Sequence, residues 1–355
     1  MTSASVNSSS VNPASVSIVS DAEIHQAAQV LLKGGLVAFP TETVYGLGAD
    51  AESREAVERI YQAKGRPSNH PVIVHIAPEA DVSYWAAQVP EEAQALIDAF
   101  WPGPLTLILK RAAHISDVVS GGQDSVGVRC PSHPVAQRLI RAFAAGKPSG
   151  QGGIAGPSAN KFGQVSPTQA SHVRDEFPEL VAQGMPILEG GASEVGIEST
   201  IVDLSRLDQG IGPVLLRPGQ ITAQQIAAVL NTAVQDADAH APRVSGALKS
   251  HYAPHTPIRL ATANDMLSLA SQAPLDASKP MVFVTHSLAQ KVLPRQPGVE
   301  WVTMSPQAGV YSHALYATLR ALDQGGYAQM VWEEVPDNLE WLGIKDRLGR
   351  AAAAF

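Results

Sequence analysis

Two basic residues separated by one glycine, Lys64 and Arg66, are the clearest chemical feature of the sequence. They stand in KGRPSNHPVIVH, between a helical pattern and an apolar run typical of a strand. Gly65 and Pro67 would hold the two cations in a tight turn, because turns favour these two residues. Cations fixed beside a strand end suit a polyphosphate, which a guanidinium binds through two parallel hydrogen bonds. The alternative is that both are solvated and complement the C-terminal dipole of the helix.

A second polar stretch, GPSAN at 156–160, places a hydroxyl and an amide two residues apart. If this stretch is extended, Ser158 and Asn160 project to the same side, since side chains alternate along a strand. Such a pair can bind a phosphate or the edge of a purine. Ser166, followed by Pro167, predicts the start of a helix whose backbone N–H groups would bind an anion. A turn and a helix cap are the plainer alternatives for the two stretches.

The segment FPTETVYGLGAD at 39–50 ends an apolar run in several hydroxyl groups, which Thr41, Thr43 and Tyr45 supply. A turn needs glycine, asparagine or aspartate, but it does not need threonines and a tyrosine. In α/β folds, ligands bind where strands end. This segment therefore predicts the wall of a binding pocket.

Other predicted strands carry polar groups at positions where packing does not require them. His75 alternates with apolar residues in VIVH, although a buried histidine with satisfied hydrogen bonds is the alternative there. Arg129 ends the apolar run SVGVR, and a buried arginine needs either an internal carboxylate or an anionic ligand. Ser199 and Thr200 begin a strand, and Arg217 ends one. Together these residues place hydroxyl groups or cations at several strand ends, a pattern that packing does not explain.

Several common catalytic patterns are missing from the sequence. It has no G-x-x-x-x-G-K-[ST], so a nucleotide would be held without a P-loop. It has no G-x-S-x-G, which argues against the nucleophile elbow of a hydrolase. GLGADA at 46–51 has the letters of a dinucleotide motif but not its position directly after a strand. One cysteine and scattered histidines predict no zinc-type metal site.

Hydrophobic periodicity predicts the elements that must position these groups. An amphipathic helix over 20–33 begins with a capping box formed by Ser20 and Glu23. Further helices are expected over 53–63, from Ser166 and over 222–230. The expected strands of this part are 36–39, 71–77, 104–110, 125–130, 186–190, 199–204 and 214–219. This alternation predicts an α/β domain over 20–230 with a mixed, twisted sheet.

The remaining segments differ in character. Residues 1–19 are rich in Ser, Val and Asn and predict a disordered tail rather than a signal peptide. Residues 231–257 lack a clear period and predict a linker. Residues 258–355 again alternate strand and helix patterns, with helices expected at 263–271, 309–324 and 342–354. They predict a small second α/β domain.

Composition narrows the classes of protein to which the chain can belong. It has 355 residues, 45% of them apolar, and no apolar run near the ~18 residues of a membrane-spanning helix. A net charge of −8 argues against binding nucleic acid through a whole basic face. The single cysteine, Cys130, suits a reducing cytoplasm. We therefore expect a soluble cytoplasmic protein with no contact with membranes.

Taken in order, these motifs closely resemble the YrdC-like threonylcarbamoyl-AMP synthases. The resemblance is carried by PTETVYGLGADA, KGRP before VIVH, WPGPLTLIL, VGVRCP, GPSAN, GIESTIVD and LLRPG, and it covers about residues 20–230. HYAPHTP and the residues after it resemble the two-domain form of the family. The resemblance implies a YrdC-like mixed-sheet domain followed by a small Rossmann-like α/β domain.

The resemblance also implies a reaction and its participants. L-threonine, bicarbonate and ATP would give threonylcarbamoyl-AMP and pyrophosphate, with Mg²⁺ accompanying ATP and no other metal. A threonylcarbamoyl transferase complex would then modify an adenosine of tRNA, and a weak contact of this chain with tRNA is a further expectation. Catalysis would rest on positioning and charge neutralisation rather than on a covalent enzyme nucleophile.

Carried over motif by motif, the resemblance assigns roles to individual residues. Lys64 and Arg66 would be catalytic. Contacts with ATP would come from Lys64, Arg66, His70, Ser125, Ser158, Asn160, Ser166, Arg217 and Tyr252. Contacts with threonine would come from Thr41, Tyr45, His75, Arg129, Gly156, Ser199 and Thr200. The sequence departs from the family at His70, where asparagine is usual, and in a longer segment at 146–153.

Two other functions are compatible with this kind of domain. One is a catalytically idle RNA-binding module, against which the acidic charge and the intact K-x-R and S-x-N motifs argue. The other is carbamoyl-adenylate chemistry of the kind found in hydrogenase maturation proteins. Those proteins carry acylphosphatase and zinc-finger segments, which this sequence lacks.

Overall fold

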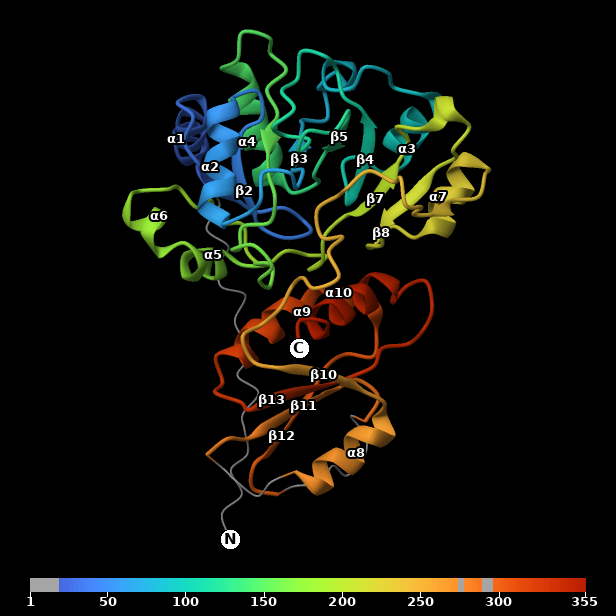
Figure 1. Cartoon of the computed structure of the whole chain (residues 1–355). Helices are drawn as coiled ribbons and strands as arrows, with labels where there is room; N and C mark the ends of the chain where they lie inside the picture. Colours follow the sequence, from blue (N-terminus) through green and yellow to red (C-terminus); the bar gives the residue numbers. More distant parts are fainter. Residues whose placement is uncertain (1–18, 274–277, 289–295) are drawn as a thin grey trace.

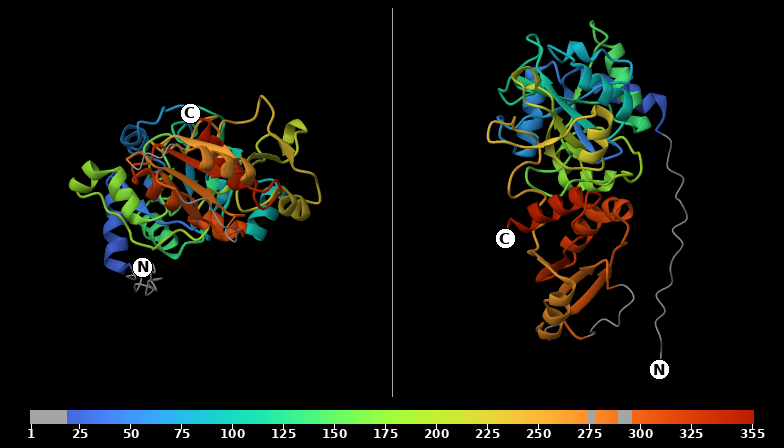
Figure 2. Two further views of the ribbon diagram at one scale, coloured as in Figure 1. Left: turned by 90° about the horizontal axis from the view of Figure 1, so that it is seen from below. Right: turned by 90° about the vertical axis from the view of Figure 1, so that its right-hand side faces the viewer.

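The computed structural model describes residues 19–273, 278–288 and 296–355. The expected tail at 1–19 lies outside the described residues except for Val19, which is buried. Two units are stacked on one another, and the chain between them runs along one side (Figures 1 and 2). No described helix combines the length and the apolar character needed to cross a membrane.

The first unit is built on a nine-stranded sheet in the order β1-β2-β6-β3-β5-β4-β7-β8-β9. Its strands are β1 (Val37–Phe39), β2 (Gly46–Asp50), β3 (Ile73–His75), β4 (Leu105–Lys110), β5 (Ser125–Arg129), β6 (Ile154–Ala155), β7 (Thr200–Asp203), β8 (Val214–Arg217) and β9 (Gln235–Asp236). The pairs β3/β5, β4/β7 and β8/β9 are parallel, and the other neighbours are antiparallel. The predicted mixed sheet is confirmed.

Helices flank this sheet at both ends of the unit (Figure 1). They are α1 (Asp21–Leu32), α2 (Arg54–Lys64), α3 (Glu91–Phe100), α4 (Pro134–Ala145), α5 (Ala170–Glu176), α6 (Pro178–Ala182) and α7 (Ala223–Leu230). The capping box of Ser20 and Glu23 forms as predicted at the start of α1. Helix α2 ends at Gly65, whose left-handed φ of 62° stops the helix directly after Lys64. The two cations of the K-x-R motif therefore lie on either side of a helix end.

The second unit is a four-stranded parallel sheet in the order β10-β13-β11-β12. Its elements are β10 (Ile258–Ala261), α8 (Ala263–Gln272), β11 (Met281–Thr285), β12 (Val299–Thr303), α9 (Ala308–Asp323), β13 (Gln329–Glu333) and α10 (Leu342–Ala352). Helix α8 covers one face of the sheet, while α9 and α10 lie on the face toward the first unit (Figure 1). The predicted Rossmann-like second domain is confirmed.

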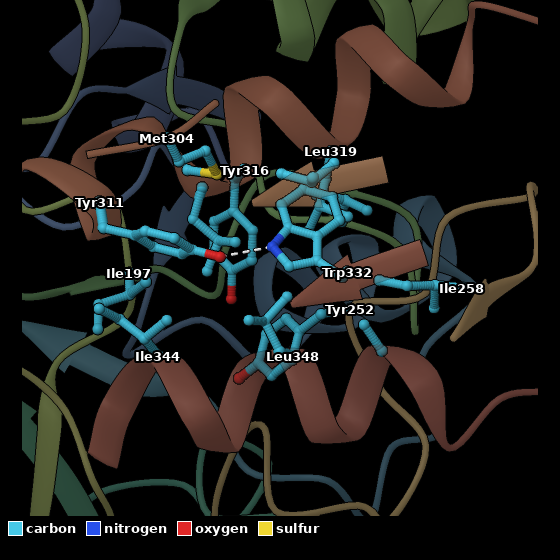
Figure 3. Packing of buried hydrophobic residues seen from close by; sticks show 14 of the residues in the cluster. Ile197, Tyr252, Ile258, Met304, Tyr311, Tyr316, Leu319, Trp332, Ile344 and Leu348 are labelled. Carbon is cyan, nitrogen blue, oxygen red and sulfur yellow. Dashed lines mark hydrogen bonds between the residues drawn. The ribbon is translucent and has the colours of Figure 1, made fainter. Parts of the chain in front are cut away.

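One apolar core joins the two units. Tyr316, Ile344 and Leu348 of the second unit share a buried cluster with Val165 and Ile197 of the first. Figure 3 shows Ile344 and Leu348 of α10 in this cluster with Ile197 and the linker residue Tyr252. The contact between the units is therefore apolar and buried, and the second unit packs directly against the first unit and the linker.

Three details of the sequence-based expectation are wrong. No helix starts at Ser166, because its hydroxyl donates to Glu198 and is not available as a cap; α5 begins at Ala170. PILEG forms only an isolated bridge between Ala38 and Ile187 rather than a strand. The predicted linker contains the two-residue strand β9, which pairs with β8.

The loop before β5 packs tightly on the segment that follows the K-x-R motif. Gly121 and Gly122 both have positive φ, 60° and 80°, but a Cβ at 121 would lie 2.6 Å from the carbonyl oxygen of Asn69, whereas a Cβ at 122 meets nothing within 4 Å. Both alanine variants incur roughly 1–2 kcal/mol of backbone strain. We expect Gly121→Ala to lower the free energy of unfolding by a further ~1–3 kcal/mol in urea titrations. Equal losses in the two variants would contradict this packing.

Candidate active site

A buried polar pocket lies where the strands of the first unit meet the linker. It is lined by Thr43, Val44, Ile73, His75, Arg129, Gly156, Pro157, Ser158, Glu198, Ser199, Arg217, Ser245, His251 and Tyr252. Among these are seven residues that the sequence predicted for the site. About 30 Å³ remains inside, which is room for two or three water molecules. Three of the lining residues, Ser245, His251 and Tyr252, come from the linker.

The sheet topology explains why residues far apart in sequence meet here. His75 and Arg129 are the last residues of the parallel strands β3 and β5 and are partners in register. Thr200 begins β7 and Arg217 ends the antiparallel strand β8, so both lie at the same edge. Ser158, in the S-x-N motif, forms a bridge with Gly46, the first residue of β2, toward the opposite end of the strands from His75. The predicted polar groups therefore come from both ends of the strands and meet over one face of the sheet, where Ile73 and His75 line the pocket.

Lys64 connects the K-x-R and S-x-N motifs. Its Nζ donates to the carbonyl oxygen of Ser158 at 2.6 Å and also to that of Asn160. Burial, together with the nearby charge of Arg66, lowers the Lys64 pKa well below its ordinary value. The Asn160 amide donates to two backbone carbonyls, while its Oδ1 is buried without a partner. Lys64 thus joins the two motifs, and Asn160 Oδ1 remains free to accept a hydrogen bond.

Arg66 is held by its own loop and by the linker. Its Nε and Nη2 donate to the carbonyl oxygens of His70 and Pro71, and Nη2 lies 3.4 Å from Ser245 Oγ. Burial lowers the Arg66 pKa to about 10, so the guanidinium stays charged at neutral pH. The His70 ring packs against Phe162, outside the pocket. The cation is in place beside the pocket, and the linker covers it.

The partner of Arg129 is an internal carboxylate. Arg129 Nη2 lies 2.6 Å from Glu42 Oε1, and both side chains are 4% exposed. Arg129 Nη1 also donates to Thr43 Oγ1, and Nε donates to the carbonyl oxygen of Gly103. This answers the question that the sequence left open, and it adds Glu42 as a positioning residue. In the sequence, the signal for this ion pair was Glu42, the single carboxylate in PTET.

His75 presents an unused ring nitrogen to the pocket. Its Nδ1 is buried without a partner, and a Cβ at Gly156 would lie 2.9 Å from it. Burial and the charge of Arg129 lower the His75 pKa to about 3, so the ring is neutral at physiological pH. A neutral ring nitrogen in this position can exchange a hydrogen bond with a hydroxyl or amine of a small ligand.

Other predicted site residues lie behind the pocket wall. Thr41 donates to the carbonyl oxygen of Val44, and Thr200 to that of Ile221. The Tyr45 hydroxyl lies between Gly190 N and Gly191 O, at 3.0 and 2.9 Å. The remaining two are Ser166, bound to Glu198, and Ser125, which lines a neighbouring hollow under the linker. The structure gives these hydroxyls supporting roles, and their direct contacts with substrates stay predictions.

Tyr252 is the strained element of the site. Its φ angle is +61°, a backbone conformation that few residues other than glycine adopt. Tyr252 is nevertheless buried, with only 1% of its surface exposed. Its ring lies under the guanidinium of Arg347 at 5.5 Å and 4.1 Å from the ring of His251. His251, Ser245 and Glu198 also belong to the site, although they were not predicted as site residues from the sequence. Their positions in HYAP, in the linker and in GIEST were the available signals.

Comparisons with known proteins match both units of the chain. Residues 29–219 match the family model Sua5_yciO_yrdC, described as "Telomere recombination". Residues 221–353 match the model described as "Threonylcarbamoyl-AMP synthase, C-terminal domain". The chain belongs to the threonylcarbamoyl-AMP synthase family. The resemblance seen in the sequence motifs is confirmed.

Individual relatives cover most of the family's two-domain architecture. Threonylcarbamoyl-AMP synthase of Bacillus subtilis is 38% identical over 354 residues, which is 94% of this chain and 93% of that protein. The Schizosaccharomyces pombe synthase is 34% identical over 89% of this chain and 85% of its own. A structure of Pyrococcus abyssi Sua5 complexed with L-threonine matches with a TM-score of 0.81 at 32% identity, covering 94% of this chain and 95% of that one. A double variant of the same protein gives a TM-score of 0.82 and covers 95% of both chains.

The buried pair of Glu42 and Arg129 predicts a specific pattern of stability. Glu42→Gln leaves the Arg129 charge unpaired in the interior, and we expect it to lower the free energy of unfolding by ~3–5 kcal/mol in urea titrations. Glu42→Gln/Arg129→Met, which removes both charges, should recover most of the loss. Glu79→Gln, in the exposed pair with Arg141, is the control and should cost less than ~1 kcal/mol. A double variant less stable than Glu42→Gln would contradict this assignment.

Proposed function

We propose that this chain is a threonylcarbamoyl-AMP synthase, which converts L-threonine, bicarbonate and ATP into threonylcarbamoyl-AMP and pyrophosphate. The observation that carries the proposal is the set of family motifs gathered around one buried pocket, on a two-domain scaffold that the Pyrococcus abyssi protein with L-threonine shares. The product would pass to a threonylcarbamoyl transferase complex acting on tRNA in the cytoplasm.

The reaction needs two bonds to form in sequence. The free amine of threonine attacks carbon dioxide supplied by bicarbonate, and an oxygen of the resulting carbamate attacks the α-phosphate of ATP, displacing pyrophosphate. The buried groups Arg129 and His75 suit the carboxylate and the hydroxyl or amine of threonine. Lys64, Arg66 and Arg217 supply positive charge on the side where the triphosphate would lie. Their role would be to orient the phosphates and neutralise the charge that develops on them.

Mg²⁺ would be carried to the site by ATP rather than by a protein cage. No group of three or more His, Cys, Asp or Glu side chains suited to a metal is present among the residues that the structure describes. The pocket's carboxylate, Glu198, already accepts from Ser166, Tyr316 and Arg347. Mg²⁺ in phosphate-transfer sites often keeps several waters and binds substrate phosphates, which fits this arrangement. When bound, the ion would neutralise charge on the triphosphate.

Substrate binding would require the linker to move. The remaining 30 Å³ cannot hold ATP, and Ser245, His251 and Tyr252 occupy the space beside Arg217 and Ser158. Arg217 Nη1 donates to the carbonyl oxygen of Ser245 at 2.9 Å, and Arg66 contacts the hydroxyl of the same residue. Ser245 of the linker thus takes hydrogen bonds from Arg217 and Arg66 that the phosphate groups of ATP would take instead. The linker would therefore act as a lid.

The most direct test measures pyrophosphate release from ATP and bicarbonate with threonine, with serine and with no amino acid. Release that depends on both threonine and bicarbonate is the expected outcome. Release without any amino acid would favour carbamoyl-adenylate chemistry instead. Absence of release, with tRNA still bound, would favour the idle RNA-binding module.

Arg66→Ala should lower kcat/KM for threonine-dependent pyrophosphate release by about 10²–10³, because one charged donor to the reacting phosphates is lost. Arg54→Ala, in an exposed ion pair at the start of α2, the helix that ends just before Arg66, is the matched control and should keep normal activity. Circular dichroism should show the same folded spectrum for both. Undiminished turnover in Arg66→Ala would remove this residue from the catalytic machinery.

A further inference from the structure

The C-terminal helix α10 places one arginine against three of the site motifs. Arg347 has a fully buried side chain, and its Nε donates to Glu198 Oε2 at 2.8 Å. Nη1 donates to the carbonyl oxygen of Pro218 at 2.8 Å, and Nη2 to that of Glu198 at 3.2 Å. The guanidinium also lies over the ring of Tyr252. One side chain of the second domain thus contacts GIEST, LLRPG and HYAP.

The helix is close enough to the first domain for these contacts because of its glycine. A Cβ at Gly343 would lie 3.0 Å from Ile197 Cδ1 and 3.2 Å from the Cα of Gly219. Gly343 is one turn before Arg347, so the same face of α10 packs on GIEST and LLRPG. This close approach fixes how α10 lies against the first domain, and it therefore fixes where the Arg347 guanidinium enters the interface.

Glu198, in turn, is connected to the predicted substrate contacts. Its carboxylate lines the pocket and accepts from Ser166 Oγ at 2.5 Å and from Tyr316 Oη at 3.0 Å. The next residue, Ser199, accepts from Arg217 through both its carbonyl and its hydroxyl oxygen, each at 3.0 Å. A change at Glu198 therefore reaches Ser166, Ser199 and Arg217.

We propose that Arg347 is a positioning residue for the substrate pocket, through which the second domain holds Glu198 and the start and end of the neighbouring strands β7 and β8 in their active geometry. The inference rests on the proposed function, since it concerns the turnover of that same site. It assigns the GIKDRLGRAA helix a role in the chemistry of the first domain. The second domain then completes the active site in addition to packing on it.

The electrostatics of Glu198 make this role separable from a purely structural one. Burial raises the Glu198 pKa, but the guanidinium groups of Arg347 and Arg217 more than offset it, and the pKa falls to about 2. The titratable and charged groups facing the site of Glu198 are Arg217 of β8, His251 and Tyr252 of the linker, Tyr316 of α9, and Asp346 and Arg347 of α10. Removing Arg347 leaves the effect of burial less compensated, so the carboxylate would take up a proton at higher pH.

The test compares Arg347→Met with Lys345→Met, a cation removed from an exposed position on the same helix. We expect Arg347→Met to lower kcat/KM for both ATP and threonine by about 10², because small displacements of reacting groups have effects of that size. The ratio of wild-type to variant kcat/KM should grow as the pH is lowered from 9 to 6. Lys345→Met should match the wild type across this range.

Two further variants separate charge from geometry. In a Glu198→Gln background, adding Arg347→Met should change activity by a factor that does not depend on pH, because no carboxylate is left to titrate. Arg347→Lys keeps a positive charge without the planar fork, so it should lose activity but keep a pH-independent ratio to the wild type. A pH-dependent ratio in the Glu198→Gln background would overturn the proposed coupling.

If Arg347→Met does not fold, Tyr316→Phe removes only the hydroxyl that donates to Glu198, and kcat/KM should fall roughly tenfold. Wild-type kcat/KM in a folded Arg347→Met, or in Tyr316→Phe where Arg347→Met cannot be made, overturns the inference. So does an equal loss in Lys345→Met. Absence of threonine-dependent pyrophosphate release in the wild type would instead refute the proposed function, and that result is recognisable before any variant is compared.

Discussion

The organisation of this protein depends on keeping buried charges paired. Arg129 is neutralised by Glu42, and Glu198 by Arg347 and Arg217, all of them nearly inaccessible to water. An unpaired charge in such an environment costs several kcal/mol, so each pair constrains the segments that carry it. In this chain those segments are the PTET, VGVRC, GIEST and LLRPG motifs and helix α10. The same pairs that make burial tolerable also place the polar groups of the pocket.

Lys64 follows the same logic with a different partner. It is buried without a carboxylate in contact, and its ammonium donates to the backbone carbonyls of Ser158 and Asn160 instead. This arrangement fixes the S-x-N loop relative to the end of α2. The cation is therefore a structural link between two motifs as well as a candidate for binding phosphate. Both roles are compatible, because an ammonium has three donors.

The linker and the second domain close the site in the described state. Tyr252 lines the pocket in a strained backbone conformation that its neighbours sustain, among them the ring of His251 and the guanidinium of Arg347. Strain held by the surrounding contacts is released when those contacts change. A lid of this kind can be displaced by ligands that bring their own interactions with Arg217 and Arg66. The two-domain form thus couples occupation of the pocket to the contact between the domains.

The sequence alone determined most of the elements, the motifs and the chemical character of the site. Capping residues, periodicity and glycines fixed α1, α2 and most strands, because these signals act over a few neighbouring residues. They could not tell that Arg129 is paired with Glu42, that Ser166 binds Glu198 instead of capping a helix, or that Arg347 reaches Glu198 across 149 positions. Such pairings depend on which strands become neighbours and on how closely α10 approaches them. Only the tertiary structure decides this, because long-range hydrogen bonds and ion pairs depend on which side chains are close in space. They leave no periodic pattern in the sequence.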